Sequence, residues 1–217
     1  DLVRSRGLGD VYKRQILRAD VATLVNRRLL IILEEGAQAK LLICDHAMDE
    51  VNFLSTQVAE VFVGENASLD LYELEETHYS TVRFSNLYVH QSAGSHVLLN
   101  GVTLHNGTTR NTVRVVLDGP GADIDLCGMA IADRDEQVDN NTFIDHRAPA
   151  CTSNELFKYV LDERSVGAFA GKVLVRPGAA GTSSLQTNRN LCATREARMY
   201  TQPQLEIYAD DVKCSHG

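Results

Sequence analysis

The stretch that decides the fold is TVRVVLDGPGADIDLCGMAI, residues 112–131, in which two β-rich runs flank a Gly-Pro-Gly turn. After the turn, Ile124 and Leu126 alternate with Asp123 and Asp125, which is the period of a strand with one buried and one wet face. Glycine at the turn supplies the positive φ that β-branched neighbours cannot adopt. The stretch therefore predicts a strand, a tight turn and a second strand.

Three upstream segments repeat this pattern: LLIILEEGAQAKLLI (29–43), VAEVFVGENASLDLYEL (58–74) and NLYVHQSAGSHVLLNGVTL (86–104). A weaker repeat, GAFAGKVLV, ends at Val175. A recurrence of roughly 30 residues in a β-rich chain is typical of a solenoid. We expect each repeat to be one coil, with Leu69 and Leu71 pointing inward like Ile124 and Leu126. The turn glycines that mark successive coils are Gly36, Gly64, Gly94 and Gly121.

The kind of solenoid follows from what the repeats lack. Helical repeats need long runs of 3.6-residue period, which are absent between Gly64 and Gly128, and leucine-rich repeats need a shorter unit with fixed leucine positions. A right-handed parallel β-helix fits, because two short strands and their turns use about 30 residues per coil. An antiparallel sandwich whose hairpins recur is the alternative, and a helix content above about a third would contradict the all-β assignment.

Two segments interrupt the repeat. In residues 16–30, the spacing of Ile16, Leu17, Val21 and Leu24 predicts a short helix. Residues 133–165 are rich in charge and asparagine and predict a loop followed by a coil with a polar turn.

Composition limits the function classes. The chain has 217 residues, 44% of them hydrophobic, enough for one elongated domain or two small ones. Its formal charge of -8 argues against a nucleic-acid or anionic-membrane partner, since either requires a basic surface. No run of about twenty apolar residues predicts a membrane span.

The opening stretch, residues 1–15, has neither a clear strand or helix period nor the apolar segment of a signal peptide. We expect it to be an artefact of gene assembly or a disordered terminus, and residues 16–217 to form the β-helix core. Without a secretory signal, the expected location is the cytoplasm.

Five dispersed cysteines predict reduced thiols, because they form no C-x-x-C pair and the expected compartment is reducing. We expect Cys127, Cys151 and Cys192 to be small buried side chains. The remaining two, Cys44 and Cys214, each lie two residues before a histidine.

The final stretch, DDVKCSHG (210–217), raises the question of a metal site. On a strand, Cys214 and His216 share one face, and a thiolate and an imidazole are both competent iron ligands. A core cysteine beside a surface histidine is the structural alternative. Cys44 and His46 repeat the spacing, so spacing alone is weak evidence.

The other histidines, His78, His90, His96, His105 and His146, are expected to be solvated or to bond within turns. An enzyme acting on acidic polysaccharides would need clustered carboxylates on an open sheet face. The candidates are Asp123 with Asp125, and Asp133 with Asp135 and Glu136, which sit in turn-like or charged surroundings. No phosphate loop, G-x-S-x-G or H-E-x-x-H motif is present, so we expect no catalytic residue and neither ATP hydrolysis nor cleavage of pectin-like polymers.

Two long stretches carry a family resemblance: NTFIDHRAPACTSNELFKYVLDERSVGAFAGKVLVRPGAAGTSSLQTNRNLC (141–192) and QPQLEIYADDVKCSHG (202–217). They resemble the SufB/SufD family, paired scaffold subunits of the SUF iron-sulfur cluster assembly machine. The KCSHG ending favours the SufD branch. The resemblance implies a right-handed parallel β-helix, a SufB-like partner and docking of a SufC-like ATPase on a C-terminal helical region that this sequence does not contain.

The same resemblance implies the function and the site. It implies a noncatalytic scaffold on which Cys214 and His216 contact a nascent cluster at the SufB interface, as candidate iron ligands. Two ligands are too few for a stable cluster, so the cluster would be transient and shared with the partner, with none tightly bound by the isolated chain. The alternatives are a purely structural β-helix oligomerisation module, homodimeric when isolated, and a polysaccharide-active β-helix enzyme.

Overall fold

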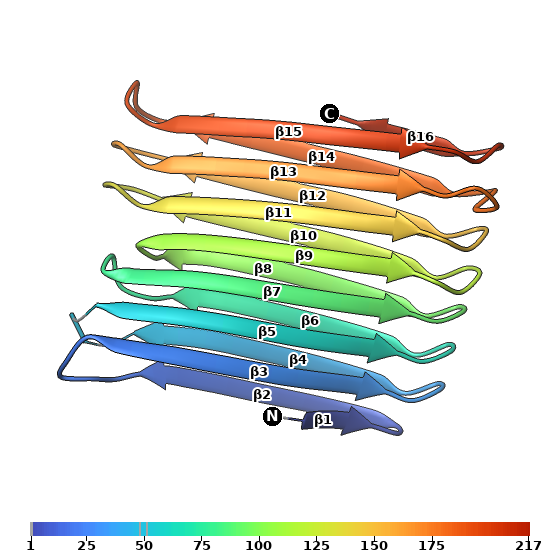
Figure 1. Cartoon of the computed structure of the whole chain (residues 1–217), viewed down its shortest axis with the longest axis horizontal. Coiled ribbons are helices and arrows are strands. Elements are labelled where there is room, and N and C mark those ends of the chain that lie inside the picture. The colour runs from blue at the N-terminus through green and yellow to red at the C-terminus, as the bar shows by residue number, and fades with distance from the viewer. Residues whose placement is uncertain (1, 48, 51) are drawn as a thin grey trace.

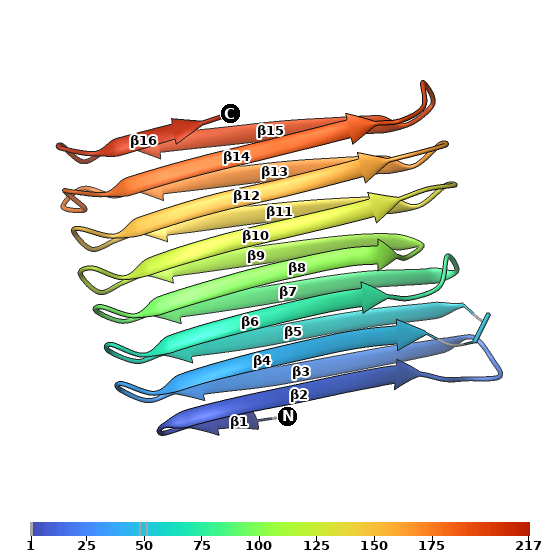
Figure 2. The ribbon, with the colours of Figure 1, turned by 180° about the vertical axis from the view of Figure 1, so that it is seen from behind.

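The computed structural model describes residues 2–47, 49–50 and 52–217, and within them every regular element is a β-strand. The chain winds as a right-handed coil, with one strand of each coil in front and the other behind (Figures 1 and 2). All pairings between neighbouring coils are parallel, each strand lying on the next but one in the chain. The right-handed parallel β-helix is thus confirmed, and no helix of the described residues could cross a membrane.

Two eight-stranded parallel sheets form the walls. The odd-numbered strands form sheet A: β1 (Leu2–Ser5), β3 (Thr23–Leu33), β5 (Phe53–Val63), β7 (Thr81–Gln91), β9 (Thr108–Leu117), β11 (Gln137–His146), β13 (Val166–Val175) and β15 (Arg198–Ile207). The even-numbered strands form sheet B: β2 (Leu8–Leu17), β4 (Gln38–Ala47), β6 (Ser68–Glu76), β8 (His96–His105), β10 (Asp123–Ala132), β12 (Thr152–Leu161), β14 (Ser183–Cys192) and β16 (Lys213–His216).

Alternation along each strand builds the core between the sheets. Leu69, Leu71, Ile124 and Leu126 are at most 2% exposed, which confirms the predicted inward face. Parallel in-register pairing places like positions above one another, so Leu69 pairs with Val97 and Val97 with Ile124. Each coil therefore covers the apolar face of the one below, and burial of these stacked side chains drives folding.

The turns from sheet A to sheet B repeat one backbone conformation. A left-handed residue occurs in each of these turns from the β3–β4 turn onward, and in all but the last its N–H bonds to a carbonyl of the next coil, as Gly36 does to Glu65 at 2.8 Å. The residues are Gly36, Asn66, Gly94, Gly121, Ala150, Gly181 and Asp211. Gly64 was predicted to mark the turn between β5 and β6, but the left-handed residue of that turn is Asn66, two residues later. Gly64 is needed for close approach instead, because a Cβ there would lie 2.8 Å from Glu35 N.

The helix predicted in residues 16–30 is wrong. Residues up to Leu17 belong to β2 and those from Thr23 onward to β3, with a turn between them. Val21 and Leu24 are 65% and 58% exposed, so the apolar spacing does not form one buried face. Pairing of β3 with β5, about 30 residues away, supplies the backbone hydrogen bonds that a helix would have made locally.

Residues 133–165 are more regular than predicted, because they contain the whole of β11 and β12, joined by a short turn. The polar residues Asn140 and Thr142 point inward on β11 at 8% and 2% exposure, which hid the strand period in the sequence. In the opening stretch the backbone forms β1 and β2, which pair with β3 and β4. That residues 1–15 are an artefact stays a prediction.

Candidate functional site

The predicted pair, Cys214 and His216, lies on β16, the last strand of sheet B, near the C terminus in Figure 2. Strand β16 pairs with β14 so that Cys214 sits opposite Ser184 and His216 opposite Gln186. Ser184 and Gln186 are 3% and 1% exposed, inward positions of β14. Both members of the pair therefore share the inward face of the last coil.

The two side chains differ in exposure. Cys214 is half-buried and packs against the hydrophobic core, whereas His216 is exposed. Burial raises the pKa of the Cys214 thiol, although a hydrogen bond involving the Ser184 backbone acts in the opposite direction. The thiol is therefore protonated at neutral pH, and metal binding there must release a proton.

A chain of neutral polar groups lies beneath Cys214, running from His146 across to Ser153 of the same coil and then up to Ser184 of the next. His146 Nε2 lies 2.9 Å from Ser153 Oγ, and Ser153 Oγ lies 2.8 Å from Ser184 Oγ. His146 is fully buried, and burial lowers its pKa to about 4. The imidazole is thus neutral, with Ser153 and Ser184 hydrogen-bonded in sequence below the thiol position.

A second chain of polar groups lies beneath His216. Gln186 Nε2 donates a hydrogen bond to Glu155 Oε2 at 2.5 Å, and Glu155 is 1% exposed. Burial raises the pKa of Glu155, which favours its protonated form. The floor under the Cys214–His216 pair is therefore polar and largely uncharged, whereas Ile124 and Leu126 hold the same positions on β10.

Sequence reasoning missed this floor. Ser153 and Glu155 alternate with exposed Thr152 and Asn154, so polar residues occupy both faces of β12 and its period is invisible in hydropathy. His146, predicted as part of a turn, is a buried strand residue instead. The available indication was positional: Ser153 and Glu155 occupy the places that Ile124 and Leu126 hold one coil earlier.

The control pair, Cys44 and His46, faces the other way. It alternates on β4 with Ile43 and Asp45, and Asp45 points inward to bond Arg27 and Arg83. Cys44 is 3% exposed, and His46 Nδ1 lies 3.1 Å from Glu76 Oε2 on the neighbouring strand. Identical spacing thus gives an outward, carboxylate-paired histidine at one site and an inward pair at the other.

The carboxylates weighed for an enzyme are tied into local pairs. His96 Nδ1 lies 2.6 Å from Asp123 Oδ2, and Arg164 holds Asp135 through two hydrogen bonds of 2.7 Å. Glu136 accepts a hydrogen bond from the Asp133 N–H at 2.8 Å, as a turn cap. Asp123, Asp135 and Glu136 thus each have a local structural partner.

The remaining cysteine and histidine predictions are partly confirmed. All five cysteines are free thiols, and Cys151 is fully buried as expected. Cys127 is only half-buried and Cys192 is exposed, unlike the buried side chains that were predicted. His78 bonds within its turn, 2.7 Å from Ser80 Oγ.

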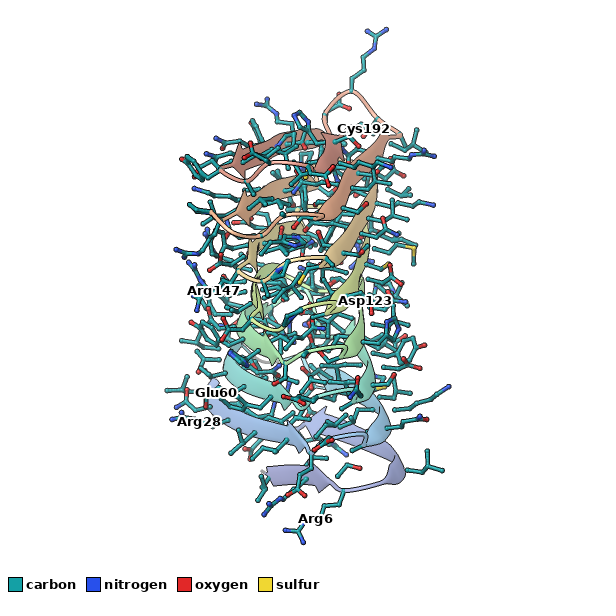
Figure 3. All side chains as sticks on the ribbon, turned by 90° about the vertical axis from the view of Figure 1, so that its right-hand side faces the viewer. Arg6, Arg28, Glu60, Asp123, Arg147 and Cys192 are labelled. Carbon is teal, nitrogen blue, oxygen red and sulfur yellow. The ribbon has the colours of Figure 1, made fainter. Side chains whose placement is uncertain are left out.

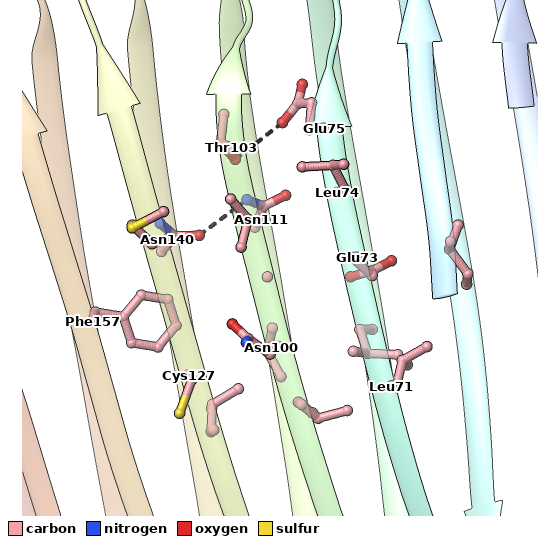
Figure 4. A pocket seen from close by; sticks show the side chains of 18 of the residues that line it. Leu71, Glu73, Leu74, Glu75, Asn100, Thr103, Asn111, Cys127, Asn140 and Phe157 are labelled. Atoms are coloured by element: carbon pink, nitrogen blue, oxygen red, sulfur yellow. Dashed lines mark hydrogen bonds between the residues drawn. The ribbon is translucent and has the colours of Figure 1, made fainter. Parts of the chain in front are cut away.

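A charged cluster and a cavity lie inside the earlier coils (Figure 4). Arg83 bonds Asp45 at 3.3 Å and lies 3.7 Å from Glu75, and Arg27 bonds Asp45 at 2.6 Å. Beside them is a cavity of about 50 Å³, lined by Glu73, Arg83, Asn111 and Asn140 among others. A polar cavity of this size is large enough to accommodate water.

Metal-binding capacity is limited. Among the described residues, no group of three or more histidine, cysteine, aspartate or glutamate side chains is placed to hold a metal ion. Cys214 and His216 together offer one thiol and one imidazole. Such a pair can supply part of an iron coordination sphere and needs donors from elsewhere to complete it.

One family model and three curated proteins match most of this chain. The family described as SUF system FeS cluster assembly, SufBD core domain, matches residues 16–217. The chain is 29% identical over 193 residues to the iron-sulfur cluster assembly protein SufD of Escherichia coli, covering 85% of this chain and 44% of that protein. It is 28% identical over 202 residues to a SufBD family protein of Synechocystis, covering 89% of this chain and 45% of that one.

A plant protein is similar over most of the chain. Protein ABCI7, chloroplastic, of Arabidopsis thaliana is 30% identical over 213 residues, covering 96% of this chain and 44% of that protein. The chain thus spans less than half the length of these three curated relatives.

Proposed function

The chain belongs to the SufBD core family of the SUF iron-sulfur cluster assembly system, and we propose that it is the β-helix core of a noncatalytic scaffold subunit. In this proposal it pairs with a SufB-like paralogue and works with a SufC-like ATPase in the cytoplasm. The observation that carries it is the inward-facing Cys214–His216 pair on the last coil of a family-matched β-helix.

The chemistry assigned to the pair is transient iron ligation. The cluster is cargo, and Cys214 and His216 would contact it while the partner supplies the remaining ligands. Because burial raises the pKa of the Cys214 thiol, an incoming metal must displace its proton, so binding at this pair should strengthen as the pH rises.

The polar floor supports the same role. Aliphatic side chains beneath the pair would leave the inner side of a bound metal site without hydrogen-bond partners, whereas Ser184 and Gln186 present polar side chains there. Their buried positions also fix the height and direction of β16. The pair is therefore held by the coil below it.

The test is cluster yield in cells that make the full assembly. Cys214→Ser removes the soft ligand at nearly constant volume, so we expect the complex to form and its iron content to fall. His216→Ala should lower iron content further if no neighbour replaces the imidazole. Iron content and cluster absorbance of the purified assembly are the measurements, with co-purification of the partners reporting complex formation.

Two control variants calibrate the result. Cys44→Ser repeats the C-x-H spacing on the outer face, and Cys192→Ser removes an exposed thiol near the same end of the coil. Cys44 is buried, so its variant counts only if the complex still forms. Unchanged iron content in both Cys214→Ser and His216→Ala, or an equal loss in either control, overturns the site assignment.

A further inference from the structure

The outer face of sheet A carries a groove of about 330 Å³ that the cluster site does not involve. We call it the aromatic–arginine groove, and its defining residues are Phe62, Tyr88, Arg114, Phe143, Arg147 and Arg176. Arg28, Glu60 and Arg147 project from this side of the stack, opposite Asp123 on sheet B (Figure 3). The groove therefore faces away from the outer surface of sheet B.

Cross-strand register builds the groove. Tyr88 on β7 pairs with Arg114 on β9, and Arg114 pairs with Phe143 on β11, so the three lie side by side across three coils. The Arg114 guanidinium carbon is 5.7 Å from the centre of the Phe143 ring, within cation–π distance. Phe62, whose ring centre is 6.3 Å from that of His90, extends the aromatic floor.

This floor is exposed. Phe62 and Tyr88 are 47% and 43% exposed, although large aromatic side chains are usually well buried. Exposed aromatic rings next to arginines are the composition found at the energetic centres of protein–protein interfaces. The floor thus offers a partner a large apolar contact.

The rim is cationic. Arg147 and Arg176 both bond the buried carboxylate of Asp145, at 2.8 and 2.7 Å, so one anion holds two guanidinium groups. Burial acts to raise the pKa of Asp145, yet hydrogen bonds from Arg176 and Arg147 hold it below its usual range. The carboxylate thus stays charged and orients both groups, which remain 43% and 46% exposed.

Arg114 has no ion-pair partner among the described residues, and its guanidinium lies over the Phe143 ring. Glu60 is already bonded to Arg28 at 2.7 Å, and Arg147 also lies 3.9 Å from Asp118. The groove and the residues paired with it thus carry four arginines (Arg28, Arg114, Arg147, Arg176) against three carboxylates (Glu60, Asp118, Asp145), so the region is locally positive in a chain of formal charge -8. The local charge is opposite to that of the whole molecule, which is a basis for selective attraction of an acidic partner.

We propose that the aromatic–arginine groove binds an acidic segment of another protein. An apolar side chain of that segment packs on Phe62 and Tyr88. Its carboxylates bond the free faces of the guanidinium groups, which suit bidentate carboxylate recognition. A nucleic acid fits less well, because its long anionic backbone would extend over the acidic remainder of the surface. The proposal is independent of the cluster site.

The experiment uses the full chain and a short fluorescein-labelled peptide in which glutamate alternates with leucine and phenylalanine. Fluorescence anisotropy should show binding that weakens with added salt. Arg114→Glu should raise the dissociation constant at least about tenfold, since it places a repulsive charge in the groove centre. Lys158→Glu, the same charge change on the exposed outer face of β12, is the matched control and should leave the constant unchanged.

Two further probes separate the contributions of charge and aromatic surface. The same peptide with glutamine in place of glutamate should bind at least tenfold more weakly if carboxylates are recognised. Tyr88→Ser, which shortens an exposed side chain, should weaken the acidic peptide as well. Equal binding by Arg114→Glu and Lys158→Glu, or equal binding of both peptides, overturns the proposal.

Other occupants give distinct outcomes. Binding of a labelled oligothymidylate that is tighter than that of the acidic peptide and is lost in Arg114→Glu assigns the groove to nucleic acid and overturns the proposal. Self-association by sedimentation that disappears in Arg114→Glu assigns it to a second copy and also overturns it. Neither readout depends on iron content, so failure here leaves the cluster-site test unaffected.

Discussion

The interiors of the earlier coils (β3 to β8) and of the later coils (β10 to β14) are occupied by different kinds of side chain. Between β3 and β8 the interior contains ion pairs among Arg27, Asp45, Arg83 and Glu75, and the cavity beside them extends as far as Phe157 on β12. Between β10 and β14 it is filled by aromatic rings, and Phe157 and Phe169 lie 4.9 Å apart between their centres. The earlier coils therefore hold charged side chains and most of a cavity, whereas the later coils hold aromatic rings.

Two glycines on neighbouring strands show how the space inside each coil is matched to the side chains that fill it. Gly101 and Gly128 are register partners on β8 and β10. A Cβ at Gly128 would lie 2.1 Å from the Phe157 ring, whereas a Cβ at Gly101 would meet no atom within 4 Å. The ring of Phe157 uses the space over one glycine, and the space over the other is part of the cavity (Figure 4).

Polar groups differ in kind as well. In the earlier coils Glu75 lies buried 3.7 Å from Arg83, and burial raises its pKa despite that partner. In the later coils the buried polar groups include the neutral His146, the serines above it, and Tyr159, whose hydroxyl donates to the Ala168 carbonyl at 2.8 Å. The earlier interior therefore depends on charge pairing, and the later one on neutral hydrogen bonds.

The largest effect should come from breaking the charge pairing. Arg83→Met keeps most of the side-chain volume but leaves Asp45 and Glu75 with less compensation, which should lower the free energy of unfolding by about 3 kcal/mol. Urea unfolding followed by circular dichroism measures it. Arg164→Met removes an exposed ion pair with Asp135 and should cost less than about 1 kcal/mol. Equal effects of the two variants would contradict the role of burial.

The stability of the later coils should instead depend on pH, through protonation of His146. Its pKa is lowered by burial to about 4 from an ordinary value of 6.5, so between these values the unfolded chain binds more protons than the folded one. Stability should therefore fall as the pH decreases from 6.5 to 4, by up to about 3 kcal/mol from this residue. His146→Gln should flatten that slope in urea unfolding measured across the range, and an unchanged slope would refute the assignment.

Sequence reasoning correctly predicted the features that follow from the alternation of apolar and polar residues along a strand. Leu69 and Ile124 were placed inward because apolar and polar residues alternate around them, and the repeat of turns predicted the coil. The same reasoning failed at Glu155 and Asn140, because an inward polar residue leaves no trace in the hydrophobic period. Cys214 and His216 were found by type and resemblance, but the direction they face depends on pairing with β14.

Long-range register also explains the errors. The helix predicted in residues 16–30 rested on local spacing, whereas β3 is fixed by pairing with β5. Cys192 was expected to be buried by its residue type, yet it is exposed at the end of β14. The groove around Arg114 was not predicted at all, since its residues come from strands about one repeat apart and share no local motif.

The smallest change in the free energy of unfolding is expected from substitutions of the paired glycines. These substitutions test most directly whether the space around each glycine is empty or filled. Neither Gly101 nor Gly128 has a positive φ, so alanine fits both backbones and only the space around each Cβ differs. Gly128→Ala forces the Phe157 ring to move and should lower the free energy of unfolding by about 1–3 kcal/mol. Gly101→Ala places a methyl group in the cavity and restricts the unfolded chain, so stability should stay constant or rise by about 0.5 kcal/mol. Urea midpoints of the two single variants measure the difference. A loss in Gly101→Ala as large as that in Gly128→Ala would mean that the earlier coil is not hollow and that the two halves are packed alike.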